Sequence, residues 1–314
     1  MKVAVLKGGR SLERQVSLRS AARVEDALDS LGYEVASLDA GGDLVARLKA
    51  ERPDVAFIAL HGPGGEDGTP QELLEILDIP YTGPGVASCI RCMDKVLTKH
   101  LLRRSGIPTP DWVAFNSTAF RELGAADALD EIEARLDFPL VVKPAGQGSA
   151  LGVRFAASRD DVPEALVAAF SYDDRVLLER HVEGRELAVS LLDGEPLPAV
   201  EVRPKEEDLF NYEARYEIGR TEYLCPAELT SDEVAEVQEV ARATYEALWC
   251  MGFARVDLIL DRASTPQVLE ANAIPGLTDT SLLPMAAEAA GLGFEELIGR
   301  IVQLALAQTS TASS

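Results

Sequence analysis

The sequence predicts an α/β protein whose C-terminal part is α+β, and three observations carry this prediction. Strand-like and helical patterns alternate through residues 1–92, as they do in open α/β sheets. Strand-like runs after residue 183 follow one another through short turns, which is typical of antiparallel pairing. A length of 314 residues exceeds what one simple core usually needs, so two or three domains are expected.

The first domain is predicted to span residues 1–92 and to contain a small open parallel sheet. Apolar runs predict strands at residues 2–6, 34–40 and 55–60. Periodic apolar positions predict helices at residues 16–31, 44–49 and 70–77. Such sheets bind ligands at the carboxyl ends of their strands, where the loops "KGGRSLER" and "HGPGGEDG" fall.

A second domain is predicted over residues 93–182 and a third over 183–307, before a frayed tail at 308–314. The second domain is expected to contain helices at 93–106 and 125–135, strands at 139–144, 153–157 and 175–182, and a helix ending at Phe170. The third is expected to contain a hairpin turn at Asp193-Gly194, a helix at 231–248, strands at 254–260 and 267–272, and two closing helices within 285–307. The polar stretch 204–223 lacks apolar periodicity and is predicted to be a lid loop.

Composition and charge restrict the partners. A net charge of −22 and a pI near 4.5 argue against nucleic acid and anionic membranes, because both are bound by basic surfaces. No apolar run reaches the roughly 18 residues of a membrane span. The N-terminus lacks a signal-peptide pattern, so a cytoplasmic location is expected. The four cysteines are expected to be reduced thiols rather than a disulfide framework.

The strands predicted at 254–260 and 267–272 carry unexpected polar residues. Because strand side chains alternate, Glu270 shares one face with Asn272, and Arg255 shares one face with Asp257. If the two strands pair, Asp257, Glu270 and Asn272 converge. Three hard oxygen donors without histidine or thiolate suit Mg²⁺ or Mn²⁺. The alternative is a surface sheet face with ordinary ion pairs.

A glycine-rich loop is suited to holding phosphate. Lys143 ends a predicted strand, and "AGQGSALG" follows it. Glycines let backbone N–H groups approach phosphate oxygens, although a glycine-rich hairpin would look similar. Glu179 and Glu186 flank the next strand boundary. They could accept hydrogen bonds from an adenine amino group and ribose hydroxyls, or they could be solvated charges.

These motifs, in this order, resemble the D-alanine–D-alanine ligases of the ATP-grasp superfamily over residues 1–306. The resemblance is carried by "GGRSLERQVSL" (8–18), "HGPGGEDG" (61–68), "IPYTGPG" (79–85), "MDK" (93–95), "GIPTP" (106–110), "KPAGQGSALGV" (143–153), "YEARY" (212–216), "YLCPAEL" (223–229) and "LEANAIPGLTDTSLLPMAA" (269–287). It implies an ATP-grasp fold, a bacterial source, a homodimer, and ATP-driven synthesis of a dipeptide for peptidoglycan through an acylphosphate.

The resemblance also implies a role for each site residue. The nucleotide would be bound by Lys95, Lys143, Glu179, Val182, Glu186, Arg215 and Leu269. Two Mg²⁺ ions would be held by Asp257, Glu270 and Asn272. The two D-alanines would be bound by Glu13, Val16, His61, Arg255, Gly276, Ser281 and Leu282, with Ser149 and Tyr216 linking Glu13 to the lid. The residues that act in catalysis would be Glu13, Ser149, Tyr216, Arg255 and Ser281.

Some positions depart from the family pattern. Arg215 replaces a lysine, Ala150 follows Ser149 where a second serine is common, and Glu72 replaces a glycine. Three other functions stay open at this point. The first is a ligase that joins D-alanine to D-lactate, and Tyr216 argues against it. The second is another ATP-grasp amide ligase that acts on different acids. The third is a nucleotide-binding regulator without catalysis, and the complete set of predicted metal donors argues against that.

Overall fold

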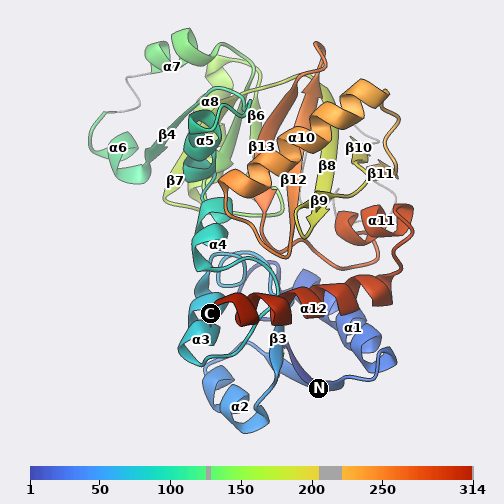
Figure 1. The fold of residues 1–314 in the computed structure, drawn as a ribbon. Helices are drawn as coiled ribbons and strands as arrows, with labels where there is room; N and C mark the ends of the chain where they lie inside the picture. Colours follow the sequence, from blue (N-terminus) through green and yellow to red (C-terminus); the bar gives the residue numbers. More distant parts are fainter. Residues whose placement is uncertain (125–128, 205–220, 313–314) are drawn as a thin grey trace.

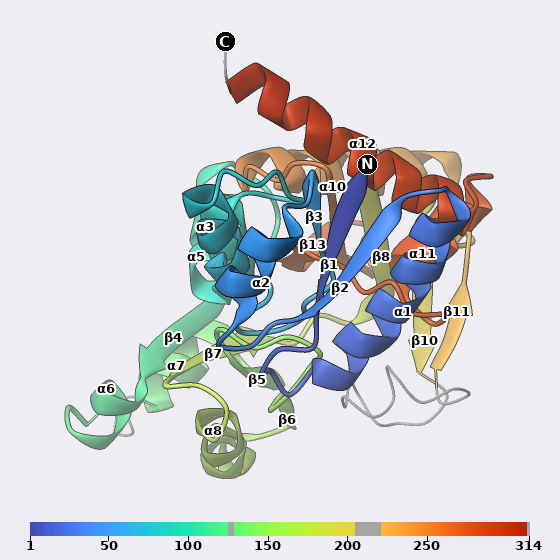
Figure 2. The same cartoon turned by 90° about the horizontal axis from the view of Figure 1, so that it is seen from below.

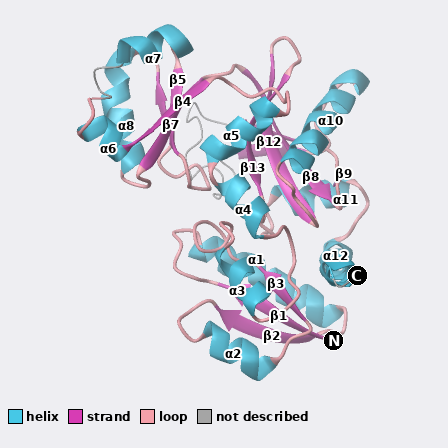
Figure 3. Ribbon diagram, turned by 60° about the vertical axis from the view of Figure 1, so that its left-hand side comes forward, coloured by secondary structure: helices cyan, strands magenta, loops and turns pink. Residues whose placement is uncertain are grey.

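The computed structural model describes residues 1–124, 129–204 and 221–312, and these residues form three sheets (Figure 1). Figure 3 shows the N-terminal sheet lying apart from the two antiparallel sheets, which face each other on the opposite side of the molecule. The architecture is therefore the one expected from the sequence, with a parallel α/β unit followed by two antiparallel units.

The N-terminal sheet is parallel in the order β2-β1-β3. Its strands are β1 (Lys2–Lys7), β2 (Glu34–Asp39) and β3 (Val55–Ile58), and its helices are α1 (Arg14–Ser30), α2 (Leu44–Glu51) and α3 (Thr69–Ile76). All six predicted elements are confirmed within a few residues. The loops 8–13 and 59–68 follow β1 and β3 and lie at the same edge of the sheet.

Two helices connect this sheet to the next one. They are α4 (Val86–Met93) and α5 (Lys95–Arg104). The prediction of one helix at 93–106 was wrong at its start, because Asp94 interrupts the helical backbone. The Asp94 Oδ1 accepts hydrogen bonds from the backbone N–H groups of Val96 and Leu97, each at 3.0 Å, and so caps α5.

The second sheet is antiparallel in the order β4-β7-β5-β6. Its strands are β4 (Trp112–Asn116), β5 (Leu140–Pro144), β6 (Arg154–Ala156) and β7 (Arg175–Arg180). Its helices are α6 (Ser117–Arg121), α7 (Leu129–Leu136), α8 (Val162–Phe170) and the 3-10 turn Arg159–Asp161. The prediction missed β4 and α6. Part of the helix predicted at 125–135 is α7, and residues 125–128 lie outside the described residues.

The third sheet follows the order β11-β10-β8-β12-β13, with β9 paired to β8. Its strands are β8 (Gly184–Leu192), β9 (Glu195–Pro196), β10 (Val200–Pro204), β11 (Thr221–Leu224), β12 (Phe253–Asp261) and β13 (Pro266–Asn272), and α10 (Ser231–Ala247) and α11 (Leu282–Ala289) pack beside it. Asp193 and Gly194 both have positive φ, at 57° and 79°, as expected of a two-residue hairpin turn. The predicted pairing of the strands at 254–260 and 267–272 is confirmed.

The last helix, α12 (Phe294–Ala312), returns to the N-terminal sheet, where it contacts α1 and β3 (Figure 2). It continues into the stretch that was predicted to be a frayed tail. One apolar core contains residues of β1, β3, β12 and α12 together, so the first and third predicted domains share their interior. Among the described residues, no helix is both long and apolar enough to cross a membrane.

Gly184 is expected to be indispensable at the start of β8, where the strand approaches β12 most closely. A Cβ there would lie 2.2 Å from the Leu260 carbonyl oxygen and 2.6 Å from the Ile259 Cγ2. Gly184→Ala should therefore lower the free energy of unfolding in urea by about 1–3 kcal/mol. Gly42→Ala is the control, because a Cβ at Gly42 meets nothing within 4 Å. Equal unfolding free energies for both variants would contradict this prediction.

Candidate active site

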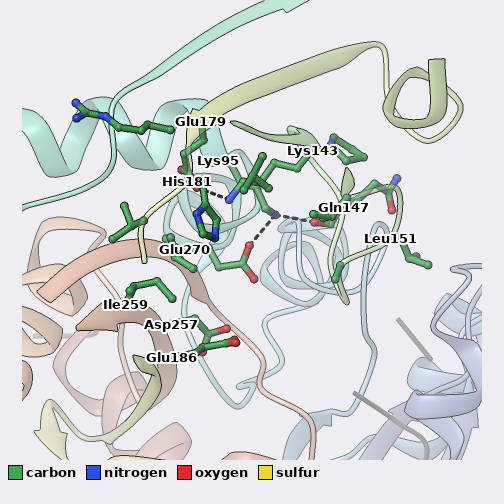
Figure 4. A pocket seen from close by; sticks show the side chains of 17 residues that line it. Lys95, Lys143, Gln147, Leu151, Glu179, His181, Glu186, Asp257, Ile259 and Glu270 are labelled. Carbon is green, nitrogen blue, oxygen red and sulfur yellow. Dashed lines mark hydrogen bonds and ion pairs between the residues drawn. The ribbon is translucent and has the colours of Figure 1, made fainter. Parts of the chain in front are cut away.

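A cleft of about 770 Å³, a volume that includes open solvent, lies between the two antiparallel sheets. Residues of the second sheet and its loops, including Lys143, Glu179 and Val182, line one wall, while Asp257, Leu269 and Glu270 of the third sheet line another. Figure 4 shows Asp257 and Glu186 together at one end, with Glu270 between them and Lys95.

The polar strip on β12 and β13 faces this cleft. Arg255 is paired with Asn272 in the register, and Asp257 with Glu270. On the opposite face of β12, Val256 and Leu258 are fully buried in the core. The predicted alternation along β12 is confirmed, and a register shift between Asp257 and Leu258 brings Asp257 opposite Glu270. Asp257 and Glu270 line the cleft, whereas Arg255 and Asn272 line adjoining hollows.

Each carboxylate of the strip is held against a cation. Arg255 donates two hydrogen bonds of 2.7 Å to the two oxygens of Asp257. Lys95 Nζ lies 3.1 Å from Glu270 Oε2 and donates to the Gln147 carbonyl oxygen at 2.6 Å. The strip is therefore close to charge balance, and a ligand with further negative charge would require additional cations.

Glu179 lies in a buried cluster with two lysines. Lys143 Nζ is 2.7 Å from Glu179 Oε1, and Lys99 Nζ forms an ion pair with Glu179 Oε2. Burial alone would raise the pKa of Glu179, but the charges of the two lysines outweigh it and lower that pKa. Burial lowers the pKa of Lys99 to about 8, although the neighbouring Glu179 opposes this shift. Glu179 is thus held as a carboxylate in the cleft wall.

The glycine-rich loop meets the N-terminal sheet at Glu13. Ser149 Oγ donates to Glu13 Oε2 at 2.5 Å, although the two residues lie 136 positions apart. A Cβ at Gly148 would lie 2.7 Å from Glu13 Oε1, and one at Gly62 would lie 2.9 Å from the same oxygen. Glycine is therefore required at both positions for the loops to close around this carboxylate.

Glu13 has an unusual electrostatic environment. Its side chain is 3% exposed, and burial together with the nearby charge of Glu66 raises its pKa to about 7. The hydrogen bond from Ser149 opposes this shift. Glu66 in turn lies 3.1 Å from His61 Nδ1 through its Oε1. A cationic group placed beside Glu13 would favour the ionised carboxylate.

A second hollow of about 500 Å³, again including open solvent, adjoins the cleft. Glu186 and Asp257 line both of them, and Arg255, Gly276, Ser281 and Leu282 line the second alone. The Ser281 Oγ accepts a hydrogen bond of 2.9 Å from the backbone N–H of Thr278. A Cβ at Gly276 would lie 2.8 Å from this oxygen, so the turn is built around the serine hydroxyl.

Comparison with known proteins agrees with this geometry. Two family models, described as D-ala D-ala ligase N-terminus and C-terminus, match residues 41–84 and 101–303. The chain is 45% identical to a D-alanine–D-alanine ligase of Syntrophotalea carbinolica over 96% of this chain and 95% of that protein. The chain belongs to the D-alanine–D-alanine ligase family.

Solved structures of D-alanine–D-alanine ligases match the whole fold. A crystal structure from Bacillus anthracis is 36% identical with a TM-score of 0.87, and the match covers 99% of each chain. A second structure from the same organism, complexed with ATP, is 34% identical with a TM-score of 0.84, again over 99% of each chain. The fold is therefore the ATP-grasp fold of the D-alanine–D-alanine ligases.

Most site residues predicted from the sequence come together in this structure. Those lining the cleft or the second hollow are Lys95, Lys143, Glu179, Val182, Glu186, Arg255, Asp257, Leu269, Glu270, Gly276, Ser281 and Leu282. Asn272 lines an adjoining hollow with Glu66 and Gly148, and Val16 is buried in α1 one turn after Glu13. Tyr216, Arg215 and most of the predicted lid 204–223 lie outside the described residues.

Sequence reasoning missed Lys99 and Glu66. Lys99 follows Lys95 by four positions, and this spacing in a helix places both side chains on one face, toward the cleft. Glu66 belongs to the loop "HGPGGEDG", which was singled out as a ligand-binding loop without a role for its acids. The sequence contained both the lysine spacing and the acidic loop. Neither could be assigned to the site without knowing which side of the helix or loop faces it.

Proposed function

We propose that this protein uses ATP to join two D-alanines into D-alanyl-D-alanine through an acylphosphate, for peptidoglycan precursors. The observation that carries the proposal is the placement of the buried Glu13 carboxylate beside the acidic strip. The adjoining hollow is lined by Gly148, which touches Glu13, and by Lys95, Glu270 and Asn272. An amino acid held at Glu13 would thus place its own carboxylate toward bound nucleotide phosphates.

In the first step, a carboxylate oxygen of the first D-alanine forms a bond to the γ-phosphorus of ATP, and the bond from that phosphorus to ADP breaks. Phosphoryl transfer depends mainly on positioning and charge neutralisation. Lys95, Lys143 and Arg215 would supply the cations, while Glu179, Glu186, Leu269 and the backbone at Val182 would hold the nucleoside. Glu13, with Val16 and His61 beside it, would hold the ammonium of the amino acid.

In the second step, the amine of the second D-alanine attacks the acyl carbon, and phosphate leaves. The incoming ammonium must lose a proton before it attacks. Arg255 and the backbone at Gly276 would stabilise the oxyanion of the tetrahedral intermediate. Ser281 and Leu282 would receive the carboxylate of the second D-alanine. The hydroxyl of Tyr216, through Ser149, would connect the lid 204–223 to Glu13.

Divalent metal is part of the proposal. The oxygens of Asp257, Glu270 and Asn272 suit Mg²⁺ or Mn²⁺, because all three are hard donors. Asp257 and Glu270 line the cleft, and Glu270 and Asn272 line the hollow that adjoins it. The described residues contain no cluster of three or more histidine, cysteine, aspartate or glutamate side chains. Phosphate oxygens would therefore complete the coordination, and the bound ions would neutralise the charge of the triphosphate.

The proposed setting follows from the charge and the family resemblance. We place the enzyme in the cytoplasm as a homodimer that acts on D-alanine and ATP. The net charge of −22 supports the absence of nucleic-acid and anionic-membrane partners.

A product assay tests the proposed function. Purified protein with ATP and Mg²⁺ should release phosphate and form D-alanyl-D-alanine from D-alanine, and L-alanine should not replace it. A panel containing D-lactate and D-serine as second substrates tests the alternatives. Preferential D-alanyl-D-lactate formation would favour the depsipeptide ligase, and nucleotide binding without any product would favour the non-catalytic regulator.

Removing one predicted metal ligand tests the metal site. Glu270→Gln keeps the size of the side chain but removes a charge, so we expect about 100-fold lower activity. Calorimetry should also show that Mg²⁺ no longer strengthens ATP binding. The control is Glu288→Gln, an exposed glutamate of α11. Unchanged Mg²⁺ dependence of ATP binding in Glu270→Gln would remove this residue from the metal site.

The pKa of Glu13, raised to about 7, predicts a pH dependence for the first D-alanine. The ionised fraction of Glu13 is lost as the pH falls through that value. The kcat/KM for the first D-alanine should therefore fall about tenfold between pH 8 and pH 6, since this constant reports the free enzyme. Glu66→Gln removes a like charge, so the midpoint should move to lower pH. An identical midpoint in wild type and variant would contradict the assignment to Glu13.

A further inference from the structure

The turn between β13 and α11 is attached to helix α1 through one residue, Leu277. The backbone N–H of Leu277 donates to Ser20 Oγ at 3.1 Å, and its carbonyl oxygen accepts from Arg23 Nη1 at 2.8 Å. Leu277 is 1% exposed, and Ser20 is fully buried. Both backbone polar groups of this residue are thus bound by side chains from a helix that is distant in the sequence.

Arg23 makes two further contacts, one with the turn and one with α12. Its Nε lies 3.0 Å from Asp279 Oδ1, and its guanidinium carbon lies 3.9 Å from the centroid of the Phe294 ring. Arg23 therefore contacts the turn before α11 and also the first residue of α12. The planar guanidinium of arginine carries five N–H donors and can also stack on an aromatic ring, so it is suited to contacting the turn and Phe294 together.

The hydroxyl of Ser20 extends the attachment to the site of the first substrate. A backbone N–H can only donate, so Ser20 Oγ accepts from Leu277 and has its own proton available for His61 Nε2, 3.1 Å away. His61 Nδ1 can then donate to Glu66 Oε1. A chain of polar contacts therefore runs from the charge beside Glu13 to the backbone of the turn.

Helix α1 is common to both sites. Glu13 precedes its first residue, and Ser20 lies seven positions later, on the same face and about 10 Å along the axis. The two neighbours of Leu277 belong to the second hollow. Gly276 lines this hollow, and the backbone N–H of Thr278 donates to Ser281, which also lines it. The separation of the two sites is therefore set by one rigid helix.

We propose that Ser20 and Arg23 are positioning residues that fix the site of the second D-alanine relative to the first. This inference rests on the proposed function, which assigns Glu13 to the first substrate and the Gly276–Ser281 turn to the second. Loss of either contact to Leu277 lets the turn shift against α1. The acylphosphate still forms, but the second amine is held less well.

The proposal is tested by measuring acylphosphate formation and attack by the second D-alanine separately in the variants Ser20→Ala and Arg23→Gln. Hydroxylamine attacks the acylphosphate of the first D-alanine, forming a hydroxamate and releasing phosphate, without using the carboxylate site at Ser281. Both variants should raise the KM for the second D-alanine about tenfold. Arg23→Gln decides the proposal, because Arg23 contacts Leu277, Asp279 and Phe294 and not the first site. Its rate of hydroxamate formation and its KM for the first D-alanine should stay within about twofold of wild type. Arg19→Gln is the matched control, because Arg19 is exposed on the same helix.

Two results would overturn the positioning role. One is a parallel fall in hydroxamate and dipeptide formation in Arg23→Gln, which indicates a general structural effect. The other is an unchanged KM for the second D-alanine in both variants. A wild-type enzyme that forms neither product would instead refute the proposed function, and the positioning role with it. Urea unfolding of each variant ensures that the comparison is made between folded proteins.

Discussion

Charge balance inside a closed cleft is the constraint on which this structure depends. Glu179 faces Lys143 and Lys99, Asp257 faces Arg255, and Glu270 faces Lys95. A buried carboxylate that loses its partner costs several kcal/mol, so each of these pairs requires the elements that supply it to stay in place. Helix α5 supplies two of the lysines, β5 the third, and β12 the arginine. Helix α5 and the two antiparallel sheets are thereby held around one electrostatic centre.

Glu13 differs from the other carboxylates of the site. Among the described residues its closest polar contact is the hydroxyl of Ser149, and no ion pair reaches it. Its pKa is raised because burial and the charge of Glu66 outweigh the hydrogen bond from Ser149 and the more distant Lys95. A cationic ligand would supply the missing compensation. The site therefore distinguishes carboxylates that the protein neutralises itself from one that a cationic ligand would neutralise.

Local patterns predicted most of the fold and many of the residues that line the cleft and the second hollow. The pairing of the strands at 254–260 and 267–272 could be predicted, because a short turn joins them. Regular pairing would place Asp257 opposite Leu269, however, and only a register shift between Asp257 and Leu258 brings it opposite Glu270. No local pattern predicted this shift. The break at Asp94 was missed although an aspartate before a helix is a capping signal. Contacts such as Arg23 with Leu277, 254 positions apart, have no local signal, since they depend on how finished elements pack. The residues that connect the two proposed substrate sites belong to this class.

The position of α12 affects the order in which the chain can mature during synthesis. This helix covers α1 and β3, yet its residues 294–312 are translated long after the N-terminal sheet has left the ribosome. The apolar side chains of α1 that pack on α12 stay uncovered until α12 has been synthesised. A nascent chain therefore exposes this part of the core until nearly all of the protein has been made. Helix α1 also carries Ser20 and Arg23. The arrangement of both proposed substrate sites thus becomes final only when the last helix docks, and a prematurely terminated product would lack this cover.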